Sequence, residues 1–291
     1  MATAGQWWQG ARPRTLPAAI APVAVGSGVA AFGGAFDLPR ALLALAVALL
    51  LQVGVNYAND YSDGVRGTDN ERVGPVRLTA TGLAVPKAVR SAALACFGAA
   101  GVVGLTLIAL TGEWWLVAVG LAAVLAAWFY TGGSHPYGYL GLGEVGVFLF
   151  FGVVATVGTA YVQTLQFTGL AWLAATGVGA LACALLVVNN LRDIPSDSVT
   201  GKRTLAVRIG DQGTRILYVG LVSTALLVLV AVAVGWTEWA LLALIGFIPA
   251  VPPVGAVAGG ARGRELIPVL VATGRCQLLY GLLLGLGLAL G

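Results

Sequence analysis

The sequence predicts an all-α, polytopic membrane protein. Only 10% of its 291 residues are charged and 58% are hydrophobic, whereas about 25% of an ordinary soluble domain is charged. Such a chain can satisfy its backbone polar groups in a bilayer as helices or as a closed barrel, and its continuous apolar runs exclude the alternation of a barrel. Soluble enzymes and disulfide scaffolds are thereby excluded. The small net charge of +4 argues against a nucleic-acid binder.

Nine stretches, uncharged except for Arg275 in the last, are long enough to cross the hydrocarbon core of a bilayer, which takes about 20 residues. They are residues 15–36, 41–59, 91–112, 114–134, two within 145–191, 216–237, 239–261 and 266–291. The double stretch is expected to divide at residues 163–169, where polar side chains and a glycine can meet the interface. In the last stretch, Gly281-x3-Gly285 favours close helix packing.

The basic residues predict the orientation of these spans. With nine crossings, fourteen of the sixteen Lys and Arg residues fall on one side of the membrane, and the opposite side has only Arg40. Because cytoplasmic loops carry the excess of positive charge, the N-terminus and the two long loops are expected to be cytoplasmic. The outward loops are very short, so we expect any chemistry on the inner face.

An Asn-x3-Asp pattern followed by a further aspartate closes the second and the sixth predicted spans. Its members are Asn56, Asp60 and Asp63 in the first copy, and Asn189, Asp193 and Asp197 in the second. Spacings of three and four residues put both aspartates of a copy on one helical face. The duplication predicts one domain, residues 1–291, built from two similar halves, residues 12–134 and 139–261, and a ninth helix, 266–291.

Four aspartates at helix C-termini disfavour the fold unless a cation lies between them. Carboxylate ligation without histidine or cysteine nearby suits Mg²⁺, which is usually shared with phosphate oxygens. Basic residues that follow the two copies are candidates for binding those oxygens: Arg66, Arg72, Arg77, Lys202 and Arg203. Two simpler interpretations remain open, because a single aspartate pair is usually a solvated turn and the positive-inside rule alone accounts for basic loops.

With these motifs, the chain resembles the UbiA superfamily of intramembrane prenyltransferases over essentially its whole length. Segments such as Tyr130-Thr-Gly-Gly133 and Gly141-Leu-Gly-Glu144, together with the Asp60-x2-Asp63 spacing, resemble the branch that acts on 1,4-dihydroxy-2-naphthoate in menaquinone synthesis. The resemblance implies nine helices around a central cavity in the cell membrane of a prokaryote. It also implies Mg²⁺-dependent transfer of a polyprenyl group from prenyl diphosphate to that small aromatic acid, with loss of CO₂, giving demethylmenaquinol.

The resemblance further implies roles for individual residues. The catalytic and metal-binding residues would be Asp60, Asp63, Asp193 and Asp197. The diphosphate would be bound by Asn56, Asn189, Arg66, Lys202 and Arg203. The acceptor would contact Arg77, Tyr130 and Tyr139. His135, the one histidine, lies beside Pro136, a position that is more often structural than catalytic.

Other functions stay open at this point. Within the enzyme class, the acceptor could be 4-hydroxybenzoate, homogentisate, haem or a phosphosugar. A membrane transporter is the alternative from another class, because repeats, proline-interrupted spans and the intramembrane Arg275 are features of transporters. A transporter would place its ion ligands near the bilayer midplane, whereas here they gather at one face.

Overall fold

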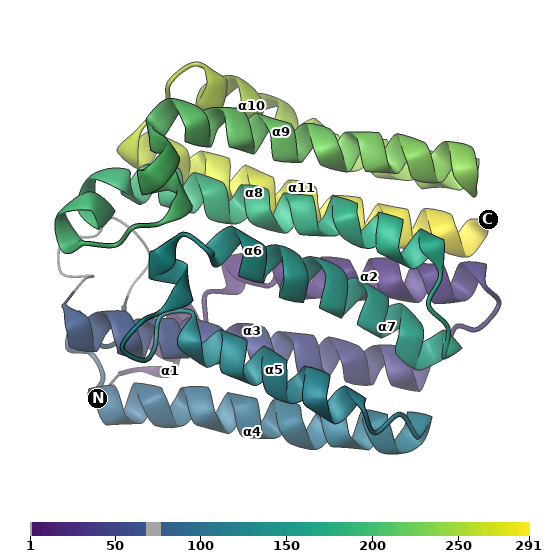
Figure 1. The fold of residues 1–291 in the computed structure, drawn as a ribbon, viewed down its shortest axis with the longest axis horizontal. Helices are drawn as coiled ribbons and strands as arrows, with labels where there is room; N and C mark the ends of the chain where they lie inside the picture. The colour runs from purple at the N-terminus through teal and green to yellow at the C-terminus, as the bar shows by residue number, and fades with distance from the viewer. Residues whose placement is uncertain (1, 68–76) are drawn as a thin grey trace.

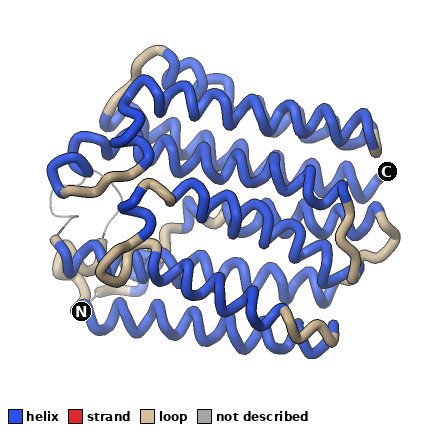
Figure 2. The backbone as a smooth tube through the Cα atoms, in the orientation of Figure 1, coloured by secondary structure: helices blue, strands red, loops and turns tan. Residues whose placement is uncertain are grey.

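The structure, a computed structural model, describes residues 2–67 and 77–291. These residues contain helices and loops without any strand (Figure 2). The α-helices are α1 Ala4–Gly10, α2 Pro17–Phe32, α3 Leu38–Arg66, α4 Pro86–Thr111, α5 Leu116–Phe129, α6 Gly143–Val147, α7 Ala155–Thr164, α8 Gly169–Thr200, α9 Leu205–Gly235, α10 Val251–Ala258 and α11 Leu266–Leu290. Short 3₁₀ segments are η1 Pro13–Thr15, η2 Tyr137–Leu140, η4 Glu238–Ala250 and η5 Gly263–Glu265, and a π-helical segment, η3 Phe148–Val154, joins α6 to α7.

The described chain has seven helical segments long and apolar enough to cross a membrane. An eighth is added if α1 and η1 are joined to α2 across a bend of 50°. An integral, all-helical membrane protein is therefore confirmed. Within the predicted stretch 114–134, helix α5 has only 14 residues, fewer than a span ordinarily needs. Counted by helix length and hydropathy, the described residues therefore do not reach the expected nine spans. The expected division of 145–191 is confirmed, because α7 ends at Thr164 and α8 begins at Gly169.

The long helices lie side by side, and the two chain termini are at opposite ends of the bundle (Figure 1). Helix α8 is at the centre, where it packs against α9, α11 and η3. The core around it includes Leu181, Tyr218, Leu229 and Tyr280, which are fully buried. Because neighbouring helices surround most of α8, its polar residues Asn190, Arg192, Asp193 and Asp197 are buried.

Close packing of α2 against α11 depends on glycine. A Cβ atom on Gly28 would lie 2.4 Å from the carbonyl oxygen of Gly285, and one on Gly281 would lie 2.5 Å from Cβ of Ala21. Both distances are far shorter than van der Waals contact. The packing role predicted for Gly281 and Gly285 is confirmed.

A left-handed glycine ends each helix that carries an aspartate motif. Gly67 ends α3 with φ 73° and Gly201 ends α8 with φ 77°. Their N–H groups donate to the carbonyl oxygens of Asp63 and Asp197, one turn back, which is how glycine commonly caps a helix C-terminus. Both motifs are thus held in the last turns of their helices, at the same end of the bundle (Figure 1).

Candidate active site

A central cavity of about 900 Å³ runs between α2, α3, α5, η3, α7, α8 and the start of α11. Its lining along α3 begins with Ala44 and Leu51 and ends with Asn59 and Asp63. The lining along α8 changes in the same way, from alanine and leucine to Asn189, Asp193 and Asp197. Because α3 and α8 end together (Figure 1), one end of the cavity is polar and charged while the rest is apolar.

Most of the residues predicted from the sequence line this cavity. They are Asn56, Asp63, Arg77, Tyr130, Tyr139, Asn189, Asp193, Asp197 and Lys202. Three predicted residues do not line it: Asp60, Arg66 and Arg203. Arg72 lies outside the described residues. The aspartates of the two motifs thus meet at one cavity, although they are far apart in the sequence.

Asp63 is surrounded by positive and donating groups. Nζ of Lys202 is 3.6 Å from its Oδ1, and Nη2 of Arg77 is 3.9 Å from its Oδ2. The hydroxyl of Tyr139 donates a hydrogen bond to the same Oδ1. The carboxylate is almost fully buried, and a buried charge of this kind needs such partners. Two cations and a phenol therefore hold its charge at the cavity wall.

Lys202 connects the ends of the two motif helices. Its backbone N–H donates to the carbonyl oxygen of Asp197 (2.9 Å), while its ammonium group reaches Asp63 across the cavity. The ammonium nitrogen also lies 4.7 Å from the ring centroid of Tyr139, within the range of a cation–π interaction. The carbonyl oxygen of Tyr139 accepts the N–H of Arg203 (3.0 Å), so the loop that carries Tyr139 is joined to the loop after α8.

Asp193 is paired with Arg192, which the sequence analysis used only as one of the basic residues that assign the cytoplasmic side. Arg192 approaches it with Nε 2.7 Å from Oδ1 and Nη2 2.8 Å from Oδ2. The same Nη2 donates to Oδ1 of Asn189 (2.9 Å). Arg192 is buried and lines the cavity. Its position inside the second motif is the signal that could have identified it.

The first motif divides its carboxylates between two environments. Asp60 is fully buried, and its two oxygens accept the backbone N–H groups of Leu78 (2.7 Å) and Thr79 (2.9 Å). Asp63, three residues on, faces the cavity. Arg66 donates to the carbonyl oxygens of Thr131 and Gly133, and Arg203 is exposed. The structure does not bring Asp60, Arg66 and Arg203 to the central cavity.

Asn59 is a cavity residue that the sequence interpretation missed. Its Oδ1 accepts the hydroxyl of Thr131 (2.8 Å), and it lies one helical turn before Asp63. Asn59-x3-Asp63 has the same spacing as Asn189-x3-Asp193, and this second way of aligning the two copies could have found it.

The N-terminal segment closes the polar end of the cavity. Nδ2 of Asn56 donates to the carbonyl oxygen of Ala11 and to Oγ1 of Thr15, both at 2.9 Å. These bonds fix the segment against α3. Arg12 and Arg14 thereby become part of the cavity lining.

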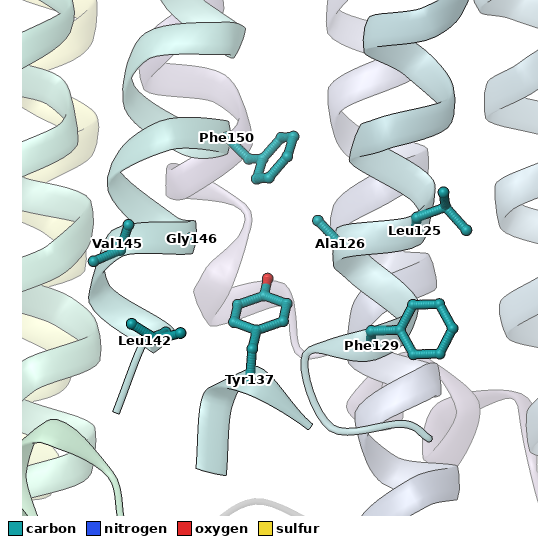
Figure 3. A pocket seen from close by; sticks show the side chains of 8 residues that line it. All are labelled: Leu125, Ala126, Phe129, Tyr137, Leu142, Val145, Gly146 and Phe150. Atoms are coloured by element: carbon teal, nitrogen blue, oxygen red, sulfur yellow. The ribbon is translucent and has the colours of Figure 1, made fainter. Parts of the chain in front are cut away.

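A smaller lateral crevice of about 360 Å³ opens between α5 and the α6–η3 helix (Figure 3). Its lining is Leu125, Ala126, Phe129, Tyr137, Leu142, Val145, Gly146 and Phe150. Four of these residues also line the central cavity, so the two spaces are neighbours. Burial raises the pKa of Tyr137 to about 12, and its phenol is neutral at physiological pH. His135 is exposed and lines neither space.

The donors at the polar end suit a hard cation. Asp63, Asp193 and Asp197 supply carboxylates, Asn59 and Asn189 supply amide oxygens, and no described histidine or cysteine lines the cavity. Oxygen donors of this kind are the ligands that Mg²⁺ takes in proteins. In the conformation described, no three acidic, histidine or cysteine side chains among residues 2–67 and 77–291 are close enough together to hold an ion. Asp63 and Asp193 are instead paired with basic side chains.

Comparison with known proteins gives concordant matches. The UbiA prenyltransferase family profile matches residues 19–259. The chain is 51% identical to a 1,4-dihydroxy-2-naphthoate octaprenyltransferase of Mycobacterium tuberculosis, covering 100% of this chain and 99% of that protein. It is 36% identical to the enzyme of the same name from Haemophilus influenzae, covering 98% and 96%.

Two solved structures share the fold. A UbiA homolog from Aeropyrum pernix K1 superposes with a TM-score of 0.72 at 13% identity, covering 91% of this chain and 95% of that one. A UbiA homolog from Archaeoglobus fulgidus, bound to GPP and Mg²⁺, superposes with a TM-score of 0.68 at 15% identity, covering 98% and 100%.

Proposed function

This chain belongs to the UbiA prenyltransferase family, and on that basis we propose that it prenylates 1,4-dihydroxy-2-naphthoate. A polyprenyl group would move from prenyl diphosphate to the ring with loss of CO₂, giving demethylmenaquinol. The observation that carries this proposal is the end-to-end identity of 51% with a protein named for that reaction. The acidic and basic end of the central cavity supplies matching chemistry.

We propose that the fold is nine crossings around the central cavity, in two similar halves, with α5 as one of the crossings. The chain termini at opposite ends of the bundle support an odd number of crossings (Figure 1). The asparagine–aspartate pairs at the ends of α3 and α8 support the halves. Because basic residues are concentrated at the polar end, we assign that end to the cytoplasmic face of a prokaryotic cell membrane.

The proposed metal ligands are Asp63, Asp193 and Asp197, assisted by the amide oxygens of Asn59 and Asn189. Asp60 is outside this set because both of its oxygens are engaged away from the cavity. Bound Mg²⁺ would neutralise charge on the departing diphosphate. Arg77, Lys202 and Arg192 now pair with the carboxylates. When prenyl diphosphate binds, these three side chains turn from the carboxylates to the phosphate oxygens.

The chain's own residues then supply positioning and exclusion of water. The basic side chains bound to the phosphate oxygens hold the allylic C–O bond at the polar end of the cavity. The electron pair of this bond leaves with the diphosphate. The ring carbon that bears the carboxylate attacks the allylic carbon, and the electrons of its bond to the carboxylate restore the ring as CO₂ departs. Tyr130 and Tyr139 line the cavity where the acceptor ring would lie. The apolar remainder of the cavity keeps water from the allylic carbon.

The acceptor is tested by incubating the purified protein with labelled prenyl diphosphate, Mg²⁺ and a panel of aromatic acids. We expect transfer to 1,4-dihydroxy-2-naphthoate with release of one CO₂ per product. Transfer to 4-hydroxybenzoate or homogentisate alone would replace the proposed acceptor and keep the reaction class. Absence of transfer to every acceptor would overturn the reaction class as well.

A further inference from the structure

The carboxylate of Asp60 is used entirely by backbone donors. Oδ2 accepts the N–H of Leu78 at 2.7 Å and Oδ1 accepts the N–H of Thr79 at 2.9 Å. The residue has no exposed surface and does not line the central cavity. Two consecutive N–H groups that converge on one carboxylate form a charge-assisted, two-point contact. This contact joins the end of α3 to a segment 18 residues further along the chain.

The segment that Asp60 holds is also fixed by apolar packing. Leu78 is fully buried in a cluster with Tyr57, Val89 and Phe97. A Cβ atom on Gly64 would lie 2.5 Å from the side chain of Thr79, so only a glycine at this place on α3 lets the segment approach. The polar and apolar contacts together determine where residues 77–79 lie relative to α3.

Arg77 immediately precedes the two N–H donors. It is buried, it lines the central cavity, and its Nη2 is 3.9 Å from Oδ2 of Asp63. A shift of the Leu78 and Thr79 backbone therefore moves Arg77 with it. Asp60 thus binds the backbone of this segment, at Leu78 and Thr79. Asp63, three residues later on α3, lies opposite the side chain of Arg77 from the same segment.

We propose that Asp60 is a positioning residue, which holds the backbone of Leu78 and Thr79 so that Arg77 points at the diphosphate subsite. It acts on the substrate only through Arg77 and binds no metal ion. The identity of the substrate in this role rests on the proposed function. The contact between Asp60 and the backbone is independent of the proposed function, and it can be measured without turnover.

The first experiment separates positioning from metal binding. Asp60→Asn keeps the shape of the side chain but replaces one carboxylate oxygen with an NH₂ group. One of the N–H groups of Leu78 and Thr79 then faces a donor instead of an acceptor. We expect the KM for geranyl diphosphate to rise about tenfold, the effect of losing one charge-assisted contact, while the Mg²⁺ concentration for half-maximal activity stays at the wild-type value. Asp63→Asn is the matched variant, in which the Mg²⁺ requirement should rise. An Asp60→Asn protein that needs as much extra Mg²⁺ as Asp63→Asn would overturn the proposal.

The second experiment tests whether Asp60 acts through Arg77. Arg77→Gln alone should raise the KM for geranyl diphosphate about as much as Asp60→Asn does. The double variant should then be no worse than Arg77→Gln, because residues that act as one unit are not additive. Multiplied effects, or an unchanged KM in Arg77→Gln, would overturn the proposal and would leave Asp60 with no residue to position.

The third experiment uses the full chain in detergent without substrate. Hydrogen exchange of the amides of Leu78 and Thr79 should be slow in the wild type and about tenfold faster in Asp60→Asn, and it should be unchanged in Asp63→Asn. Equilibrium binding of Mn²⁺ without pyrophosphate should be equal in the wild type and Asp60→Asn, because Asp60 is not a metal ligand. These readouts stand even if no aromatic acid accepts the prenyl group, so failure of the reaction assignment is distinguishable from failure of this proposal. Unchanged exchange in Asp60→Asn would overturn the proposal.

Discussion

The ammonium nitrogen of Lys202 lies 3.6 Å from Oδ1 of Asp63, across the polar end of the central cavity. Its own backbone N–H caps α8 at the carbonyl oxygen of Asp197. One residue therefore touches the last turns of both motif helices, and its charge is placed where a diphosphate would enter between them.

Lys202→Met is expected to weaken prenyl diphosphate binding. Methionine retains much of the length of the side chain but removes the charge, so we expect the KM for prenyl diphosphate to rise about tenfold or more, as for loss of a hydrogen bond to a charged group. The KM for the aromatic acceptor should change little. Steady-state kinetics with each substrate varied in turn checks this. Lys87→Met, at an exposed lysine near the start of α4, is the control and should behave as wild type.

Substitution of the cavity aspartates is expected to remove activity without removing the protein from the membrane. Asp63→Ala, Asp193→Ala and Asp197→Ala should each lower the rate of Mg²⁺-dependent prenyl transfer at least about 100-fold, a loss typical of groups that stabilise developing charge. Transfer assays on membranes with matched protein levels measure this. Asp211→Ala is the control, because Asp211 pairs with Arg215 away from the cavity. Retained turnover in two or more cavity variants would contradict the metal assignment.

Arg192→Ala is expected to destabilise the protein mainly in the absence of a divalent cation. The pair of Arg192 and Asp193 is almost fully buried, and removal of one partner from a buried pair costs about 3–5 kcal/mol. A bound cation near Asp193 would replace part of the lost charge. Thermal unfolding in detergent, with and without Mg²⁺ and pyrophosphate, should therefore show a larger loss of Tm without them. Equal losses under both conditions would argue that no cation binds at Asp193.

Gly28→Ala is expected to destabilise the contact of α2 with α11. The new Cβ atom would lie 2.4 Å from the carbonyl oxygen of Gly285, and backbone atoms cannot move aside cheaply. Overpacking of this kind costs about 1–3 kcal/mol. Gly98→Ala on α4 is the matched control, because nothing lies within 4 Å of its added Cβ atom. A thermal unfolding series in one detergent compares the two, and equal Tm values would contradict the packing role of Gly28.

Most helices could be predicted because the local sequence contains their physical cause. Long apolar runs must be helical in lipid, and the turn at residues 165–168 follows from the polar side chains around it. Helix α5 shows the limit of this reasoning. Its predicted stretch was long enough to cross a bilayer, but the helix ends at Phe129 and the following residues form the loop that carries Tyr139 to Asp63. The contact of that loop with α3 and the loop after α8 is not visible in local hydropathy.

Within the candidate site, spacing brought forward Asp63, Asp193 and Asp197 but could not distinguish Asp60 from them. It also led to Asn56, whose amide holds the N-terminal segment, and it passed over Asn59, which lies one turn before Asp63. Arg192 was hidden among basic residues that membrane topology already explained. For Asp60, Asn56 and Asn59 the deciding partner is distant in sequence. Arg192 instead pairs with Asp193 and Asn189 on its own helix, and only its burial at the cavity distinguishes it from the other basic residues.

By itself, the order of residues determined that this chain is helical and membrane-embedded and that its acids and bases gather at the ends of two helices, since composition and periodicity suffice for those conclusions. Only the tertiary structure decided which carboxylate faces the cavity. That choice depends on the rotation of α3 about its axis and on the return of residues 77–79 to Asp60. Both are set by packing between segments far apart in the chain, which no local pattern records.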